Sequence, residues 1–143
     1  VKALDEEDGD ITQNVSIVSN TVDTSKKGEY EVHYSVTDSD NNTVEAVQYV
    51  FVGDYVNPVD TNYIIKAQNF AVWVESMEGT DAEILKHSNT VVYEIKNKQK
   101  VEVNDLAQVK SSGDYAKKVV GDYPIEIGIK GHEETAKIIG KVS

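Results

Sequence analysis

The sequence predicts an all-β protein made of two tandem β-sandwiches. One strand pattern occurs twice, because residues 28–36 (GEYEVHYSV) are matched by residues 121–129 (GDYPIEIGI), and each copy opens with Gly, an acid and Tyr. Both copies then alternate apolar and polar residues, which is typical of half-buried antiparallel strands. Roughly nine short apolar runs separated by turn residues, with few helical patterns, complete the signature of paired sheets.

Composition narrows the classes of function. The 143 residues include no cysteine and no arginine, and the net charge is −11. Disulfides, thiolate metal sites and a cysteine nucleophile are therefore excluded. Binding to nucleic acid or to an anionic membrane surface is not expected of so acidic a chain. No apolar run approaches the roughly 20 residues of a membrane helix. The chain opens without a signal-peptide pattern, so we expect an internal fragment of a longer protein.

The first predicted sandwich covers residues 1–53. An acidic loop at 3–10 turns at Gly9, and a short strand follows at 14–18. The strand at 28–36 and its partner at 43–52 flank a turn at 38–42. In the partner strand the predicted inward face is Val44, Ala46, Val50 and Val52, and the opposite face carries the apolar stripe Val47, Tyr49 and Phe51. At 53 residues this unit is shorter than the roughly 100 residues of an immunoglobulin-type sandwich. We therefore expect it to lack its opening strand or strands.

A linker is predicted at 54–62, where Gly53 and Pro58 interrupt the apolar pattern. The charge supports a boundary near residue 53, because residues 1–53 carry eleven acids and three lysines, and the remainder fourteen acids and eleven lysines.

The second predicted sandwich covers 63–143. The run 63–75 contains strand residues with a break or bulge at Gln68–Asn69. Thr80 to Glu83 has the spacing of a capping box, which predicts one short helix. Further strands are expected at 91–95 and 100–103, followed by a less regular connection, and the hairpin from 121 to 142 closes the sheet.

Three segments of the first unit resemble a known family. They are residues 3–12 (ALDEEDGDIT), 22–30 (VDTSKKGEY) and 36–43 (VTDSDNNT). Together they are similar to the bacterial immunoglobulin-like repeat of Gram-positive cell-surface proteins, over essentially all of residues 3–52. Asn41 departs from the pattern, which usually has Gly there. The second unit is similar only in outline and in its final hairpin. The resemblance implies an immunoglobulin-like fold in an extracellular, cell-wall-linked protein, and it supplies no catalytic residues.

The acidic loop is the most suggestive group for metal chemistry. Hard oxygen ligands at close spacing suit calcium, and a second loop could join them if both loops met at one end of the sandwich. The residues concerned are Asp5, Glu6, Glu7, Asp8 and Asp10, with Asp38 and Asp40 on the second loop. The spacing does not match an EF-hand, so a solvated loop is the favoured interpretation. The same carboxylates have no surrounding cleft that would suggest glycoside hydrolysis.

Histidine and aromatic residues receive structural interpretations. His33, His87 and His132 are far apart in sequence and predict no zinc site. Tyr30 and Tyr123 are expected to be core tyrosines whose hydroxyls bond nearby backbone, in preference to stacking on a ligand. Trp73 is expected in the core, with a half-exposed place in a sugar-binding groove as the alternative. For the stripe Val47 to Phe51, an interaction patch and a covered face remain equally open.

We therefore predict no catalytic, cofactor-binding or metal-binding residues. The expected function is that of a non-catalytic stalk module of a Gram-positive cell-surface protein, which presents a distal domain and contributes to adhesion. The expected partners are neighbouring repeats of the same protein. One alternative is an adhesin module that binds a host protein or glycan through the Val47–Phe51 stripe and the loops at 38–42 and 131–134. Another is an accessory domain of a secreted hydrolase.

Overall fold

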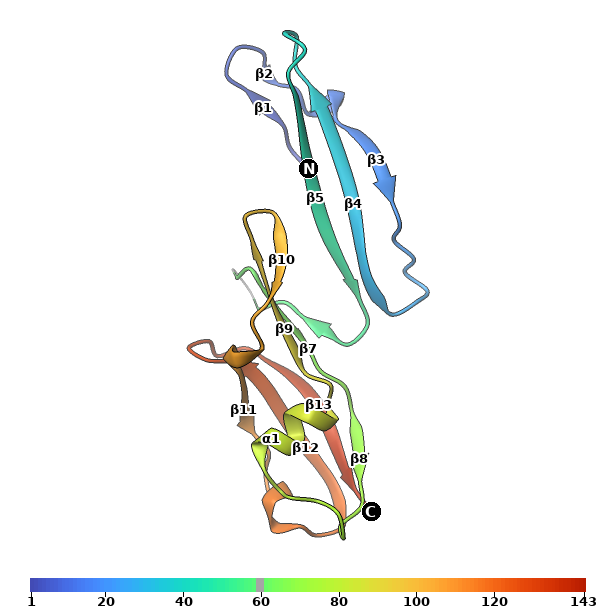
Figure 1. Ribbon diagram of the computed structural model, residues 1–143, viewed down its shortest axis with the longest axis vertical. Coiled ribbons are helices and arrows are strands. Elements are labelled where there is room, and N and C mark those ends of the chain that lie inside the picture. The colour runs from blue at the N-terminus through green and yellow to red at the C-terminus, as the bar shows by residue number, and fades with distance from the viewer. Residues whose placement is uncertain (59–60) are drawn as a thin grey trace. The chain divides into compact units, whose positions relative to one another are not determined.

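A computed structural model describes residues 1–58 and 61–143 of the chain. The chain divides into two compact units, Val1–Gly53 and Asp54–Ser143, and each is described here on its own (Figure 1). Both units consist mainly of strands, as the sequence predicts.

The first unit is built on a three-stranded antiparallel sheet in the order β3 (Ser16–Asn20), β4 (Gly28–Thr37) and β5 (Thr43–Val52). A small hairpin of β1 (Leu4–Asp5) and β2 (Gly9–Asp10) precedes it, followed by a 3-10 turn over Thr12–Asn14. Strands β4 and β5 pair without interruption from Gly28 opposite Val52 to Thr37 opposite Thr43. This register confirms the predicted division of β5 into two faces, because Tyr34 lies opposite Ala46 and His33 lies opposite Val47. The prediction that Val44 and Ala46 point inward is wrong, since both are exposed.

The first unit encloses little apolar surface. Among residues 1–53, all of which the structure describes, Val32 is the single hydrophobic residue in the buried class. Ile17, Val18 and Val44 stay 59–64% exposed although they belong to strands. The layer opposite the sheet consists of two-residue strands, which are too short to cover ten-residue ones. Such a unit matches the predicted sandwich that lacks its opening strands.

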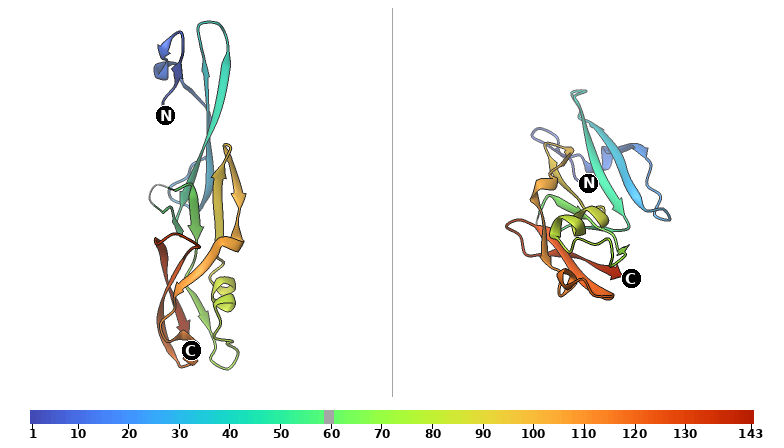
Figure 2. Two further views of the ribbon diagram at one scale, coloured as in Figure 1. Left: turned by 90° about the vertical axis from the view of Figure 1, so that its left-hand side faces the viewer. Right: turned by 60° about the horizontal axis from the view of Figure 1, so that its bottom comes forward.

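The second unit is a sandwich of two four-stranded sheets. One sheet has the order β10 (Gln99–Glu102), β9 (Val91–Lys96), β7 (Tyr63–Lys66) and β6 (Tyr55–Val56). The other has the order β11 (Ala107–Ser111), β12 (Gly121–Ile129), β13 (Thr135–Val142) and β8 (Phe70–Val72). In Figure 2 (left) the yellow-green helix α1 (Asp81–His87) lies on one side of this unit, and the orange and red strands lie on the other.

The predicted linker differs from the structure at its start. Tyr55 and Val56 form β6, which pairs antiparallel with Lys66 and Ile65 of β7, and Ala67 N donates to the carbonyl of Asp54. An aromatic and a β-branched residue favour a strand here, and the neighbouring Gly53 and Pro58 obscured that preference. Residues 59–60 of the predicted linker lie outside the described residues.

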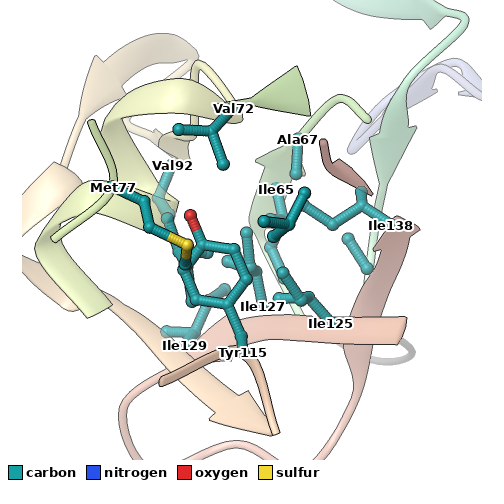
Figure 3. Packing of buried hydrophobic residues seen from close by; sticks show 13 residues of the cluster. Ile65, Ala67, Val72, Met77, Val92, Tyr115, Ile125, Ile127, Ile129 and Ile138 are labelled. Atoms are coloured by element: carbon teal, nitrogen blue, oxygen red, sulfur yellow. The ribbon is translucent and has the colours of Figure 1, made fainter. Parts of the chain in front are cut away.

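The core of the second unit lies between its sheets. It contains Ile125, Ile127 and Ile129 of β12, which are fully buried, with Ile65, Val92 and the ring of Tyr115. Figure 3 shows the Tyr115 ring among the buried side chains of this cluster. The clean alternation in β12 predicted its buried face, and a buried isoleucine contributes about 1.5–3 kcal/mol relative to an exposed one.

The prediction that Trp73 belongs to the core is wrong. Its side chain is 68% exposed. The strand alternation explains this result, because Val72 and Val74 pack in the core and the residue between them must face the other way. Phe70 lies with Val72 and Val74 on the core side, in keeping with this alternation.

Helix α1 begins and ends as the sequence predicts. The Thr80 hydroxyl accepts from Glu83 N at 3.2 Å, and Asn89, just after the helix, has a left-handed φ of 50°. The break between β7 and β8 is also confirmed. Gln68 N donates to Ser88 O at 2.9 Å, and the Asn69 side chain accepts from Ile139 N at 2.8 Å, so both residues leave the strand ladder.

Candidate functional site

The acidic loop of the first unit uses its carboxylates to hold turns. Asp5 Oδ1 accepts from the backbone N–H groups of Glu7 and Asp8 at 2.9 and 2.8 Å, and Asp10 Oδ1 accepts from Thr12 N at 2.9 Å. Hydrogen bonds from the Thr12 side chain and backbone hold the pKa of Asp10 below its ordinary value. Oxygens occupied in this way stabilise loop geometry.

The two acidic loops do meet, as the calcium hypothesis required. Asp8 Oδ2 accepts from Ser39 N at 2.9 Å, and Asp8 Oδ1 accepts from Ser39 Oγ at 2.8 Å. Asp38 turns inward on its own loop, where it accepts from the side chain and backbone of Asn42, and these bonds lower its pKa. Within the described residues no three acidic or histidine side chains are grouped so that they could hold a metal ion. The contact between the loops is therefore made by a serine.

The paired tyrosines confirm the predicted hydroxyl bonds to nearby backbone, while both side chains are half-buried and neither is fully in a core. Tyr30 donates its hydroxyl to Lys26 O at 2.8 Å, and Tyr123 donates to Val119 O at 2.7 Å. In both cases the acceptor carbonyl belongs to the residue four positions earlier in the chain. A Cβ built on the glycine two residues before each tyrosine would lie 3.5 Å from the tyrosine hydroxyl oxygen. That spacing is an ordinary van der Waals contact, so the ring packs over the glycine. The duplicated Gly–acid–Tyr pattern encodes one local fastening, the hydrogen bond from the tyrosine hydroxyl to the segment that precedes its strand.

The three histidines lie in separate environments. His33 faces outward on β4, and its Nε2 lies 2.9 Å from Glu31 Oε2. His87 at the end of α1 lies 3.8 Å from Glu83 Oε1 and stacks on Phe70 at 5.9 Å between ring centroids. The His132 and Tyr63 rings pack edge to face, with 5.3 Å between their centroids. Each histidine has a neighbour that accounts for its position, and none lies beside another.

The second unit contains a buried carboxylate, Glu83, which the sequence pattern marked only as part of the helix cap. Glu83 is 5% exposed and accepts hydrogen bonds from Glu78 N, Gly79 N and the Tyr115 hydroxyl at 2.9, 2.8 and 3.0 Å. Burial alone would raise the pKa of Glu83, but these donors and the nearby His87 hold it below its ordinary value. Burial, together with Glu83, raises the pKa of Tyr115. The group joins three segments of the unit, and all of its oxygens are satisfied.

One open hollow lies within the first unit. It is an open groove of roughly 270 Å³. Leu4 and Ile11 line one side, and Tyr34 and Val36 of β4 with Val44 of β5 line the other. The groove follows from the small second layer of this unit. The stripe Val47, Tyr49 and Phe51 on the opposite face is half-buried, so the structure does not present it as a bare apolar patch.

Comparison with known proteins agrees with this architecture. Residues 1–52 match the family described as bacterial surface protein, Ig-like domain. This first unit is a bacterial surface Ig-like domain. The match ends one residue before the division between the two units, and it includes the Tyr30 fastening and both acidic loops.

Two further similarities concern larger proteins. A 39-residue stretch is 59% identical to the pesticidal crystal protein Cry22Aa of Bacillus thuringiensis, and it covers 27% of this chain and 5% of that protein. The structure of the M60 catalytic domain with the CBM51-1 and CBM51-2 domains of Clostridium perfringens ZmpB aligns with 99% of this chain and 29% of its own, at 13% identity and a TM-score of 0.41. That similarity is too low to carry an argument about function.

Among the described residues no helix has the length and apolar character needed to cross a membrane.

Proposed function

We propose that this chain is a non-catalytic structural module of a Gram-positive cell-surface protein, placed outside the cell and associated with its wall, where it holds a distal domain away from the surface. The family description of residues 1–52 supports a surface location. The similarity to 5% of a much larger protein fits an accessory module in a longer chain. Neighbouring repeats of the same protein are the proposed partners.

The observation that carries the mechanical role is the pairing of β8 with β13. These strands run parallel, with Gly140 opposite Phe70 and Val142 opposite Val72. Ser143 N then donates to Val72 O at 3.0 Å, and Val74 N donates to Ser143 O at 2.9 Å. A pull on the chain after Ser143 loads these bonds along the strand direction. Bonds loaded in this way must break together, whereas a hairpin pulled apart at its open end loses them one by one.

Single-molecule stretching of the full chain between two handles tests this role. Lys141 points its N–H to the same side as Ser143, toward β8, because the two residues are two positions apart in one strand. Lys141→Pro removes that donor and is expected to lower the unfolding force of the second unit. Lys137→Pro is the matched control, since it lies in the same strand and on the same side but outside the register with β8. Equal unfolding forces for both variants would contradict the proposal.

A further inference from the structure

Trp73 is the single tryptophan of the chain and it is 68% exposed. Tryptophan is highly buried on average, so a solvent-facing one sets this part of the surface apart. Its backbone is held on both sides. Ser76 donates through its N–H and its hydroxyl to Trp73 O at 3.0 and 3.1 Å, and the hydrogen bonds of Ser143 to residues 72 and 74 bracket it. The indole is therefore presented from a fixed part of the sheet.

The sheet register identifies the neighbours of Trp73. Val72 and Val142 face the core, so Ala71, Lys141 and Ser143 lie on the outer face with Trp73. Lys141 pairs with Ala71 on one side and with Asp122 on the other. The next row of this face holds Ile139, which is 40% exposed, opposite Pro124. We call this surface, formed by Ala71, Trp73, Asp122, Pro124, Ile139 and Lys141, the Trp73 face.

The Trp73 face carries both apolar and charged residues, contributed by three neighbouring strands about 4.8 Å apart. Lys141 pairs with Ala71 and with Asp122 in one row of this face, and Trp73 lies two positions beyond Ala71 in the chain. The centres of protein interfaces are depleted in Lys and Asp, and a stable one covers about 800 Å² on each partner. A face this mixed fits a ligand that is itself apolar on one side and rich in hydroxyl groups at its edge.

We propose that the Trp73 face binds a neutral saccharide, with one sugar ring stacked on the indole and its hydroxyls hydrogen-bonded to Asp122 and Lys141. A sugar ring has an apolar C–H face and a hydroxyl rim, which matches the indole and its two charged neighbours. The net charge of −11 and the carboxylate on the face itself disfavour anionic polymers. This inference goes beyond the mechanical role, which depends on backbone bonds of β8 and β13 and requires no ligand.

The fluorescence of the single tryptophan reports directly on this face. The full chain is titrated with cellohexaose, chitohexaose and mannohexaose to about 10 mM, well above a roughly millimolar Kd. A blue shift of emission and protection from acrylamide quenching are expected with at least one of the three. If none of them protects Trp73, the proposal is overturned. Protection that rises with protein concentration in the absence of sugar would also overturn it, because it would make this face an interface between copies.

Variants separate stacking on Trp73 from binding elsewhere, with affinity measured by calorimetry. Trp73→Ala is expected to weaken binding about tenfold or more, whereas Trp73→Phe keeps an aromatic face and retains most of the affinity. Val101→Ala is the matched control, since it shortens another exposed apolar residue on the opposite sheet. Unchanged affinity in Trp73→Ala would overturn the proposal. The unfolding force of Trp73→Ala should equal that of the natural chain, so the two proposals fail independently.

Discussion

The substitution Glu83→Gln should destabilise the second unit far more than its small chemical change suggests. The carboxylate is 5% exposed and accepts three hydrogen bonds, one on Oε1 from Glu78 N and two on Oε2 from Gly79 N and Tyr115. Glutamine has the same shape, but its amide presents two N–H donors on one side. Whichever way the amide turns, it points N–H groups at a backbone N–H.

The expected loss in the free energy of unfolding follows from these contacts. One buried N–H left without an acceptor costs about 1–3 kcal/mol. The bonds that remain change from charged to neutral acceptors, which weakens each by about 1 kcal/mol. Relief from burying a charge offsets part of this loss. We expect a net destabilisation of about 2–3 kcal/mol, which corresponds to a fall in Tm of roughly 10–20 °C for a unit of this size.

Thermal and urea unfolding followed by far-ultraviolet circular dichroism provide the measurement. Glu133→Gln on the exposed turn before β13 is the control, because it makes the same chemical change in solvent. Tyr115→Phe should cost about 1 kcal/mol alone and less when combined with Glu83→Gln, because the hydroxyl then has no charged partner. If Glu83→Gln shifts Tm no more than Glu133→Gln, the reasoning about this carboxylate is refuted.

The pH dependence of the same variant gives the sign of the effect. The pKa of Glu83 is lowered in the folded state, so its charged form contributes stability that is fully present above its unfolded pKa of about 4.3. That contribution is lost as pH falls through the folded pKa, because the unfolded chain then takes up the proton more readily. The difference in unfolding free energy between natural chain and Glu83→Gln should therefore shrink below about pH 4. A difference that grows on acidification would contradict the assignment.

Three further predictions follow from the contacts and burial of the two units. Tyr123→Phe removes the bond to Val119 O and should lower the unfolding free energy of the second unit by about 1 kcal/mol in urea titration; no change would contradict the fastening role. Gly140→Ala places a Cβ 2.8 Å from both Ile125 and Phe70 and should cost about 1–3 kcal/mol, more than Gly121→Ala, whose nearest contact is 3.5 Å. By hydrogen exchange, amides of β12 and β13 should exchange more slowly than those of β4 and β5, and equal rates would contradict the uneven burial of the two units.

Local patterns in the sequence predicted much of the fold. The alternation in residues 28–36 and 121–129 gave the correct faces of β4 and β12, and the Thr80–Glu83 spacing located α1. These signals succeed because strand phase and helix capping depend on residues two to four positions apart. The duplicated Gly–acid–Tyr pattern belongs to the same class, since each tyrosine bonds a carbonyl four residues away.

Features that depend on distant residues were missed. Glu83 and Tyr115 are 32 residues apart, and nothing local marks them as partners. The parallel pairing of β8 with β13 joins residues 70 positions apart and adds a short strand to the edge of a sheet. Trp73 differs from these, because its exposure follows from local strand alternation between Val72 and Val74, against the general tendency of tryptophan to be buried.

Stretching the single chain tests the central claim most directly. The claim is that two separate β units follow one another in the chain and that the second unit resists the higher unfolding force. The first unit has 53 residues and the second has 90. At about 3.5 Å per extended residue, they should release roughly 19 and 32 nm of chain, less their folded end-to-end distances. We predict two events, with the shorter release at lower force because the first unit buries so little apolar surface. A single event, or a longer release that comes first, would contradict the account.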